Sequence, residues 1–181
     1  MLYQFNCKIT EEDYLAFNIY TGTEKPESRK RILQVRLIFL FLTLALFVVS
    51  LLCSSSPFFS VTYAIILGIF SSIYILGYKK FLIASIKNQI QRLKKQGKLP
   101  FNEEETTEFY PDKIVNALNA QRLEIRYDGI ENVCIVDNQY IYLFLNFSNA
   151  IILPISQVRS QADMGQFLEF LRQKFPNITY C

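Results

Sequence analysis

The sequence contains no histidine and no tryptophan. Without histidine, the chain has no imidazole for general-base catalysis, for metal ligation, or for a Ser-His or Cys-His pair. Four cysteines are present, but no two form a CxxC pair, so neither a zinc site nor a disulfide framework is indicated. The six glycines are scattered and form no phosphate-binding loop. No cofactor or metal is therefore expected, and an enzyme is the least favoured class of protein.

Charged residues are also absent from two long stretches of the chain, residues 37–53 and 58–78. A helix that crosses a bilayer needs about 20 mostly apolar residues. The second stretch has this length, and the first reaches it together with its neighbours. A core helix of a soluble protein would carry charge on one face over such a length, so a buried hairpin is the weaker alternative. We therefore predict a transmembrane helical hairpin over residues 37–78.

Basic residues flank this hairpin on both sides, in residues 25–36 and 79–98, whereas the link Ser54–Pro57 is uncharged. By the positive-inside rule, both termini are expected in the cytoplasm and the protein in the cell membrane, with two spans. Anionic lipid headgroups attract such cations, although the same residues serve equally to fix the topology. The residues predicted to contact headgroups are Arg29, Lys30, Arg31, Lys79, Lys80, Lys87, Lys94 and Lys95.

The second basic segment also has helical periodicity. Four apolar residues recur every three or four positions, and three lysines follow one another at intervals of seven. We therefore predict that the second span continues as a basic amphipathic helix to Gln96, where Gly97 and Pro100 stop it. Nucleic acid is not an expected partner, because the lysines lack a recognisable binding fold and interleaved aromatics. The two stripes are Ile83, Ile86, Ile90 and Leu93, and Lys80, Lys87 and Lys94.

Small residues lie inside the second span, and small side chains let helices approach closely. Gly68, Ser71 and Ser72 are therefore predicted to pack against the first span or against a second copy of the chain, which would make a homo-oligomer. No ionisable residue lies inside either span, so an ion path through one copy is not expected.

Residues 2–9 alternate between apolar and polar side chains, which predicts a half-buried strand. Nothing near this strand in the sequence can pair with it, so its partner is expected from beyond the hairpin. Thr10 and Asp13 fit a capping box, with Asp in place of Glu, that begins a short helix. Thr21-Gly22-Thr23 and Pro26 are expected to end that helix.

Beyond the hairpin, an acidic linker over residues 99–107 contains Glu103–Glu105, and the periodicity then changes to two. Turn residues punctuate the region, and Asp128-Gly129 is the strongest hairpin signal, followed by Asp137-Asn138. The predicted strands are 108–110, 114–118, 122–127, 131–136, 140–147 and 150–155.

A final helix is predicted to begin after Ser160, its expected N-cap, with Asp163 three residues on. Its apolar stripe must cover a sheet or the open end of a small barrel, and Pro176 ends it. The stripe consists of Met164, Phe167, Leu168, Leu171 and Phe175.

Both faces of the predicted strand 140–147 are apolar. Tyr140, Tyr142 and Phe144 share one face, and aliphatic residues share the other. One interpretation is that the aromatic face docks a partner protein or a lipid tail. The other is that this face packs on the C-terminal helix or on the N-terminal segments. Tyr140, Tyr142 and Phe144 are thus the candidate partner-binding residues.

The order of these elements resembles the YcxB-like family of bacterial membrane proteins. Arg126-Tyr127 stands where that family often has a Trp, and Pro154-Ile155 where it often has Pro-Lys, so a surface contact by that lysine is not expected here. The resemblance implies a PH-like C-terminal domain and a membrane location, but no established activity. The matching segments are EDYLAFN (12–18), the basic-flanked hairpin, YDGIENV (127–133), YIYLF (140–144), IILPI (151–155) and FLEFL (167–171).

Together these features predict an α+β membrane protein, with a two-helix transmembrane hairpin inserted in a PH-like small β-barrel or sheet domain with a C-terminal capping helix. The predicted function is that of a non-catalytic, membrane-anchored cytoplasmic module that binds a protein partner or acts in regulation. A lipid-binding or lipid-sensing domain, and a membrane immunity or regulatory subunit, are the alternatives. The predicted parts are 1–24 (strand and helix), 25–36 (basic segment), 37–78 (hairpin), 79–98 (amphipathic helix), 99–107 (linker) and 108–181 (PH-like domain).

Overall fold

The computed structural model describes residues 1–53, 57–97, 104–118, 121–176 and 178–180. The chain divides into two compact units. One unit consists of Met1–Phe17 together with Gly97–Cys181, and the other is the intervening Asn18–Gln96. The chain therefore leaves the first unit after a short N-terminal segment and returns to it after the second.

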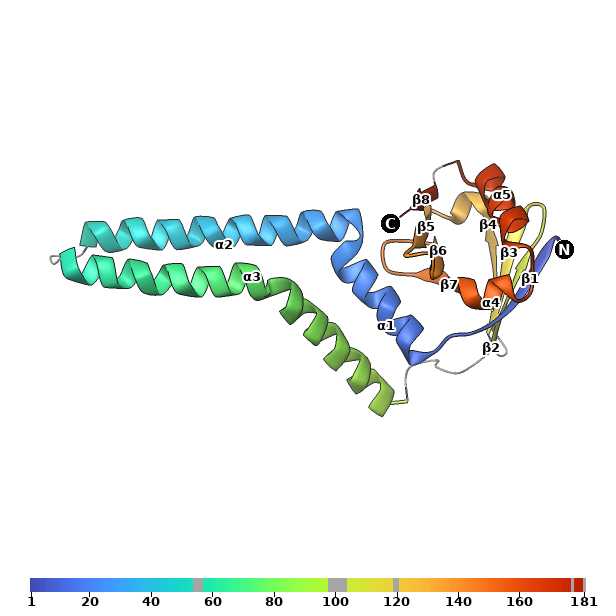
Figure 1. Ribbon diagram of the computed structural model, residues 1–181, viewed down its shortest axis with the longest axis horizontal. Helices are drawn as coiled ribbons and strands as arrows, with labels where there is room; N and C mark the ends of the chain where they lie inside the picture. The colour runs from blue at the N-terminus through green and yellow to red at the C-terminus, as the bar shows by residue number, and fades with distance from the viewer. Residues whose placement is uncertain (54–56, 98–103, 119–120, 177, 181) are drawn as a thin grey trace. The chain divides into compact units, whose positions relative to one another are not determined.

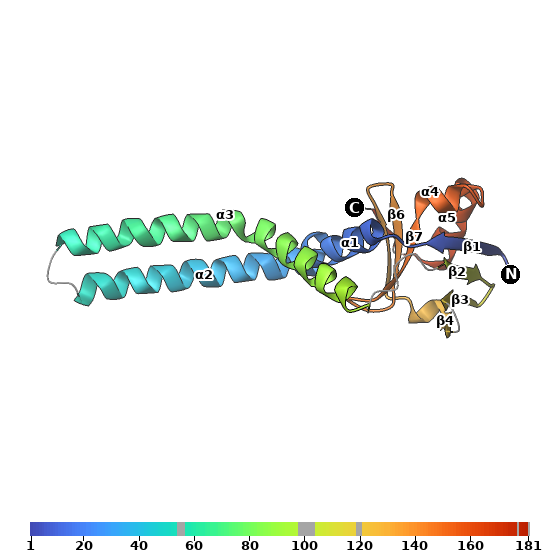
Figure 2. The ribbon, with the colours of Figure 1, turned by 90° about the horizontal axis from the view of Figure 1, so that it is seen from below.

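Two long helices make up most of the second unit (Figure 1). Helices α2 (Pro26–Cys53) and α3 (Pro57–Lys95) lie side by side in both ribbon views (Figures 1 and 2). Both are long and apolar enough to cross a membrane, and 0% and 6% of their most apolar windows are buried. The described residues of the chain therefore leave these apolar runs exposed. In the core of a soluble protein, other parts of the chain would cover them. Ser54–Ser56, predicted as the link, lie outside the described residues.

The basic segment continues α3 as predicted, to Lys95. Gly97 follows with a φ of 64°, the left-handed conformation that commonly ends a helix. Pro100 lies outside the described residues. Figure 1 shows α3 bending between its apolar and basic halves, so the basic half leaves the line of the hairpin.

The contact between α2 and α3 uses only part of the predicted packing face. Ser71 is buried, and its hydroxyl donates to Thr43 Oγ1 at 3.1 Å. The ring of Phe39 stacks on Tyr74, with centroids 4.1 Å apart. Gly68 and Ser72 are exposed instead, so they do not pack against the first span, and their packing against a second copy stays a prediction. The reason is helical geometry: Ser72 points about 100° away from Ser71, and Gly68 points in a direction closer to that of Ser72 than to that of Ser71.

The N-terminal strand pairs with a strand from beyond the hairpin, which confirms that prediction. β1 (Tyr3–Lys8) is antiparallel to β2 (Glu104–Phe109), in a register that joins Lys8 to Glu104. β3 (Lys113–Leu118) and β4 (Gln121–Arg126) complete an antiparallel four-stranded sheet in the order β1-β2-β3-β4. Phe5 and Cys7 of β1 are fully buried, as the alternation predicts. The predicted turn at Asn119-Ala120 lies outside the described residues.

The free edge of β1 is closed by two glutamine side chains. Gln161 accepts from the N–H of Asn6 at 2.8 Å and donates to its carbonyl at 2.9 Å. Gln157 does the same for Lys8, at 2.8 and 3.0 Å. A side-chain amide has the same donor and acceptor as a peptide group, so each glutamine takes the place of one residue of a neighbouring strand.

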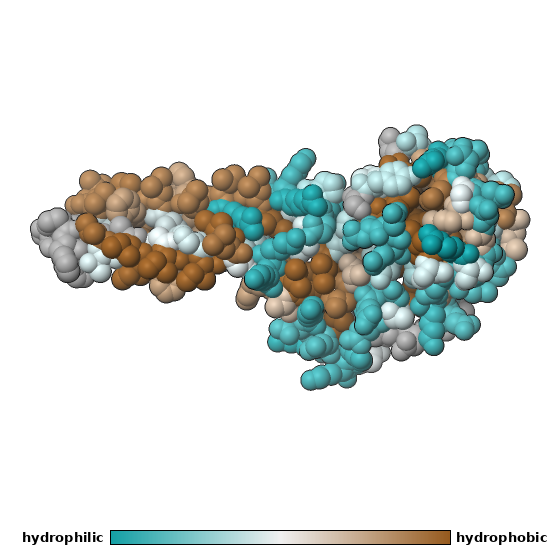
Figure 3. Space-filling model, in the orientation of Figure 1, coloured by the Kyte–Doolittle hydropathy of each residue, from teal (hydrophilic) through white to brown (hydrophobic). Residues whose placement is uncertain are grey.

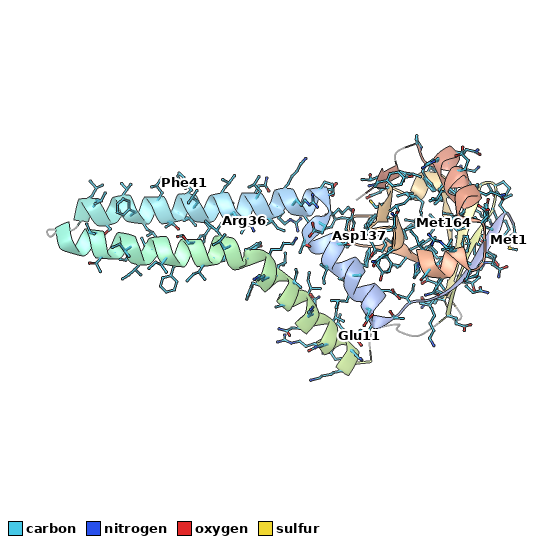
Figure 4. All side chains as sticks on the ribbon, in the orientation of Figure 1. Met1, Glu11, Arg36, Phe41, Asp137 and Met164 are labelled. Atoms are coloured by element: carbon cyan, nitrogen blue, oxygen red, sulfur yellow. The ribbon has the colours of Figure 1, made fainter. Side chains whose placement is uncertain are left out.

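A second sheet has the strand order β7-β6-β5-β8. The hairpin of β5 (Asn132–Val136) and β6 (Tyr140–Phe144) turns at Asp137 and Asn138, whose φ values of 50° and 52° confirm the predicted turn (Figure 4). β7 (Ala150–Pro154) pairs with β6, and β8 (Ile178–Tyr180), which the sequence analysis missed, pairs with β5 in parallel. Among the described residues the strands form two sheets, and no barrel is closed.

The strongest hairpin signal, Asp128-Gly129, proved wrong. It lies in a 3-10 turn, η2 (Tyr127–Gly129), that links β4 of the first sheet to β5 of the second. Gly129 does not have a positive φ here. Glycine permits the left-handed conformation of a tight hairpin but does not impose it, so the dipeptide also suits a crossing between sheets.

Two helices follow β7, where one was predicted. α4 (Ile155–Arg159) ends at Arg159, with Ser160 as its C-cap. α5 (Met164–Lys174) begins after Asp163, whose carboxylate accepts from the N–H of Gln166 at 3.0 Å. Asp163 is therefore the N-cap, and the assignment of that role to Ser160 is wrong. The predicted apolar stripe is confirmed: Phe167 and Leu171 are fully buried. The ring of Phe167 lies 4.7 Å from Phe5 and 5.2 Å from Phe109, so α5 covers the first sheet.

The predicted acidic linker is partly strand. Glu104 and Glu105 belong to β2, whereas Glu103 lies outside the described residues. Glu105 lies on the same face of β2 as the fully buried Thr107, and Asn116 Nδ2 donates to its carboxylate. Burial raises the pKa of Glu105 from its usual 4.5. A charge in this place opposes folding, because little solvent remains to stabilise it.

We expect Glu105→Gln to raise the free energy of unfolding at pH 7. Because the folded-state pKa of Glu105 lies above the unfolded value, its stabilising contribution is present below pH 4.5 and is lost as the pH rises through the folded pKa. Glutamine keeps an acceptor for Asn116 without the charge. Thermal unfolding of the full chain in detergent at pH 4 to 8 measures the effect. Glu104→Gln, at the exposed neighbouring position, is the control and should change little.

Candidate functional site

The residues predicted to contact headgroups lie on α2 and α3, and we call them the basic collar. All eight side chains are exposed. Figure 3 shows hydrophobic residues along most of the hairpin and hydrophilic residues towards the end at which these side chains lie. In the apolar run of α2, Phe41 points away from the helix, with 71% of its surface exposed (Figure 4). The basic collar consists of Arg29, Lys30, Arg31, Lys79, Lys80, Lys87, Lys94 and Lys95.

The basic half of α3 has the predicted two stripes. Ile90 is 4% exposed, and Ile83, Ile86 and Leu93 are half-buried, whereas the three lysines spaced seven apart are exposed. Ile86 packs against Gly22: a Cβ at Gly22 would lie 2.9 Å from Ile86 Cδ1, closer than such atoms approach. Glycine at this position therefore allows the chain before α2 to approach α3.

A π-helical turn, η1 (Tyr20–Glu24), connects α1 (Glu11–Ile19) to α2. The α-helix thus ends at Ile19, before the predicted Thr21-Gly22-Thr23, and these three residues continue it as one π-helical turn that ends before Pro26. Side-chain hydroxyls hold this turn: Thr23 donates to the carbonyl of Ile19 at 2.8 Å, and Ser28 donates to that of Thr21. Tyr20, Thr21 and Thr23 are buried, which makes η1 a fixed part of the unit.

Glu24, the last residue of η1, lies between the two helices. Its carboxylate is 2.8 Å from Arg29 Nη2 of α2 and 2.5 Å from Lys79 Nζ of α3. The hydrogen bond from Lys79, followed by that from Arg29, lowers the pKa of Glu24. The sequence analysis gave Glu24 no role. It also treated Arg29 and Lys79 as available to lipid, whereas the structure pairs both with one internal carboxylate.

The predicted partner-binding patch is not an exposed surface. Tyr142 and Phe144 are fully buried and Tyr140 is half-buried. The ring of Phe17, from α1, lies 5.2 Å from that of Tyr142 and 5.9 Å from that of Phe144. The docking interpretation is therefore wrong for Tyr142 and Phe144, and the alternative, packing on an N-terminal segment, is confirmed. The apolar face of α1 indicated this packing in the sequence, because such a face must be buried against another element.

Tyr140 joins this face to the capping box of α1. Asp13 Oδ2 accepts from the N–H and the hydroxyl of Thr10 at 2.9 and 2.7 Å, and Asp13 N donates to Thr10 Oγ1 at 3.2 Å, so the capping box is confirmed. The hydroxyl of Tyr140 donates to Asp13 Oδ1 at 2.9 Å. Both carboxylate oxygens of Asp13 are therefore engaged in holding the fold. Burial, then the hydrogen bond to Asp13, raises the pKa of Tyr140 to about 12.

Tyr140→Phe is expected to lower the free energy of unfolding at neutral pH by roughly 1–2 kcal/mol, the range for a half-buried hydrogen bond to a charged group. Because the folded-state pKa of Tyr140 is raised from 10.0 to about 12, its contribution is fully present below pH 10 and is lost as the pH approaches 12. The difference between wild type and variant should therefore shrink from pH 10 upwards. Thermal unfolding between pH 7 and pH 11.5 checks this, and a difference independent of pH would contradict it.

A cavity of about 330 Å³ borders the same residues, and polar side chains contribute to its lining. Asp13, Tyr140, Ser156 and Arg159 contribute to its lining. Asp13 and Tyr140 are engaged with each other, so neither is poised as a base. Among the described residues, no group of three or more Cys, Asp or Glu side chains could hold a metal ion.

The comparisons add no identity to this geometry. The chain matches no protein-family model, no curated protein and no solved structure.

Proposed function

We propose that this chain is a membrane-anchored regulatory or interaction protein of a bacterial inner membrane, related to the YcxB-like family. It has a PH-like cytoplasmic domain and no catalytic activity. The observation that carries the proposal is the pairing of β1 with β2. Because these strands precede and follow the hairpin, one folded domain is connected at two points to the pair of apolar helices.

The distribution of charge supports a membrane location with both termini in the cytoplasm. The basic collar lies where the chain enters α2 and leaves the apolar half of α3, and the link at the other end is uncharged. Cations are retained on the cytoplasmic side of membrane helices. The exposed apolar surfaces of α2 and α3 would be unfavourable in water and favourable in lipid.

The order of elements supports a PH-like domain. A four-stranded antiparallel sheet is followed by a β5-β6-β7 meander and then by α5, whose apolar stripe covers the first sheet. This inventory is an argument about fold alone, since one fold supports many functions. The absence of histidine from the sequence, and the structural use of Asp13, favour binding over catalysis.

Reporter fusions test the topology. A fluorescent reporter that matures only in the cytoplasm, fused to either terminus, is expected to be active in both fusions. An enzyme reporter that works only outside the inner membrane is expected to be inactive in both. Activity of the external reporter at either terminus would overturn the proposal, because β1 and β2 must fold together on one side of the membrane.

Site-specific photocrosslinking in living cells tests the interaction. A photoreactive residue at Glu124, exposed on β4, is expected to give a discrete adduct with a protein partner. The matched position is Phe41, exposed on α2. Adducts formed at Phe41 and not at exposed positions of the β domain would instead support an immunity or regulatory subunit that acts through its spans.

Lipid binding is a second candidate function, favoured by the exposure of all eight residues of the basic collar. A Lys or Arg near an anionic membrane surface contributes about 1 kcal/mol to binding. In this case the collar would hold the domain at the cytoplasmic leaflet.

A further inference from the structure

Arg29 and Lys79 come from different helices and meet at one point. Arg29 lies on the first turns of α2 and Lys79 follows the last residue of the apolar run of α3. Their terminal nitrogens lie 2.8 and 2.5 Å from the two oxygens of the Glu24 carboxylate. Two cations that each contact a different oxygen of one carboxylate form an anion site, and in this structure its occupant is a side chain of the same chain.

The position of Glu24 is fixed by its surroundings. Ser28 Oγ donates to the carbonyl of Thr21, and Gly22 packs against Ile86 of α3. These contacts hold η1 against both helices, so the carboxylate is presented between them. The packing of η1 therefore holds the Glu24 carboxylate near Arg29 and Lys79, in addition to the ion pairs themselves.

We infer that Arg29 and Lys79 form a binding site for the phosphate of an anionic lipid headgroup, which Glu24 occupies in its absence. This inference rests on the proposed membrane location. Lys79 directly follows the apolar run that ends at Tyr78, which is the level at which headgroups lie. Arg and Lys bind phosphate through the same charge-assisted hydrogen bonds that they make with a carboxylate.

The lipid can displace the carboxylate because the ion pairs are partly exposed. The side chains of Arg29, Lys79 and Glu24 are 65%, 48% and 32% exposed. Ion pairs with this much solvent contact contribute little, since water and salt screen them. Lys30 and Lys80, the next residues along the chain, are also exposed, and their charge attracts an anionic membrane surface, which raises the local concentration of headgroups. Glu24 therefore sets the affinity for the headgroup by competing with it.

The test measures lipid binding to the full chain in detergent micelles by native mass spectrometry. The probe is phosphatidylglycerol, with phosphatidylcholine as the reference lipid. Glu24→Gln is expected to raise the affinity for phosphatidylglycerol about fivefold, the gain from one fully available cation near an anionic surface. Adding Arg29→Gln and Lys79→Gln to this variant is expected to abolish the gain.

Glu27→Gln is the matched control. Glu27 is exposed in the first turn of α2 and makes no ion pair in the part of the chain that the structure describes. The substitution removes the same charge only three residues away, so it should leave the affinity nearly unchanged. Equal gains for Glu24→Gln and Glu27→Gln would overturn the site, because the effect would then be one of net charge.

A second arm replaces the lipid with glycerol 3-phosphate. Binding of the soluble phosphate as tight as that of the lipid, with the same dependence on Arg29 and Lys79, would overturn the assignment to a headgroup. Arg29→Gln with Lys79→Gln in a chain that keeps Glu24 should weaken lipid binding even if the Glu24 variants do not fold. Equal lipid binding by all variants would contradict the headgroup site at Arg29 and Lys79. The proposed function would still stand if the reporter fusions show the proposed topology.

Discussion

A chain in which a flexible Gly/Ser linker replaces residues 18–96 is expected to fold as a soluble domain, whereas residues 97–181 alone are not. The fragment 97–181 lacks β1, and β2 would lose the partner with which it pairs along its full length. It would also lose Phe5 and Cys7, both fully buried, and Phe17, which covers Tyr142 and Phe144. Burying one Phe contributes about 1.5–3 kcal/mol, so these losses are a large part of the 5–15 kcal/mol that stabilises a typical domain.

Circular dichroism and size-exclusion chromatography of the two proteins check this expectation. The linked chain should be monomeric and unfold in one cooperative transition, and the fragment 97–181 should aggregate or unfold without cooperativity. The linked chain with Phe5→Asp is the control, since it keeps the same length but buries a charge beside Phe167 and Phe109. A cooperative transition of the fragment at the same temperature would contradict the structure.

Phe167→Ala is expected to lower the free energy of unfolding by about 3–5 kcal/mol, the cost of replacing a buried Phe and leaving a cavity. Phe167 is fully buried, and its ring meets those of Phe5 and Phe109 at 4.7 and 5.2 Å. Its loss therefore weakens the packing of α5 on β1, which precedes the hairpin in the sequence, and on β2, which follows it.

Thermal unfolding of the full chain in detergent, followed at the β domain, measures the effect of Phe167→Ala. Gln173→Ala is the control on the same helix, because Gln173 is exposed and its loss leaves no cavity. An unfolding temperature for Phe167→Ala no lower than that of Gln173→Ala would contradict the packing described here.

Sequence alternation located β1 because its apolar and polar residues alternate, with one face buried. It placed β2 at 108–110 instead of Glu104–Phe109, because the glutamates and threonines that begin this strand are also typical of a linker. It could not assign the aromatic side of β6, since both faces of that strand are apolar and both are buried. β8 was missed because three residues after Pro176 are too few to show a period. Asp137-Asn138 and Asp128-Gly129 look alike as turn signals. Only the pairing of the flanking strands, a property of the whole fold, distinguishes a hairpin from a crossing between sheets.

The junction at Glu24 was beyond the reach of the sequence for a different reason. Charge counting identifies a basic segment, but it does not show which cation meets an isolated acid from a distant part of the chain. Lys79 and Glu24 meet because η1 is a π-helical turn and because Gly22 lets that turn approach Ile86. Neither feature has a sequence pattern as regular as that of a helix or a strand.

The two glutamines on the edge of β1 bear on how neighbouring copies behave. An open strand edge is a template on which neighbouring copies of a protein join into larger sheets. Gln157 and Gln161 satisfy the N–H and carbonyl groups of Asn6 and Lys8 within the molecule. Neighbouring copies therefore do not join into a larger sheet through these residues of β1. A partner that adds a strand to the first sheet would instead meet β4, at its opposite edge.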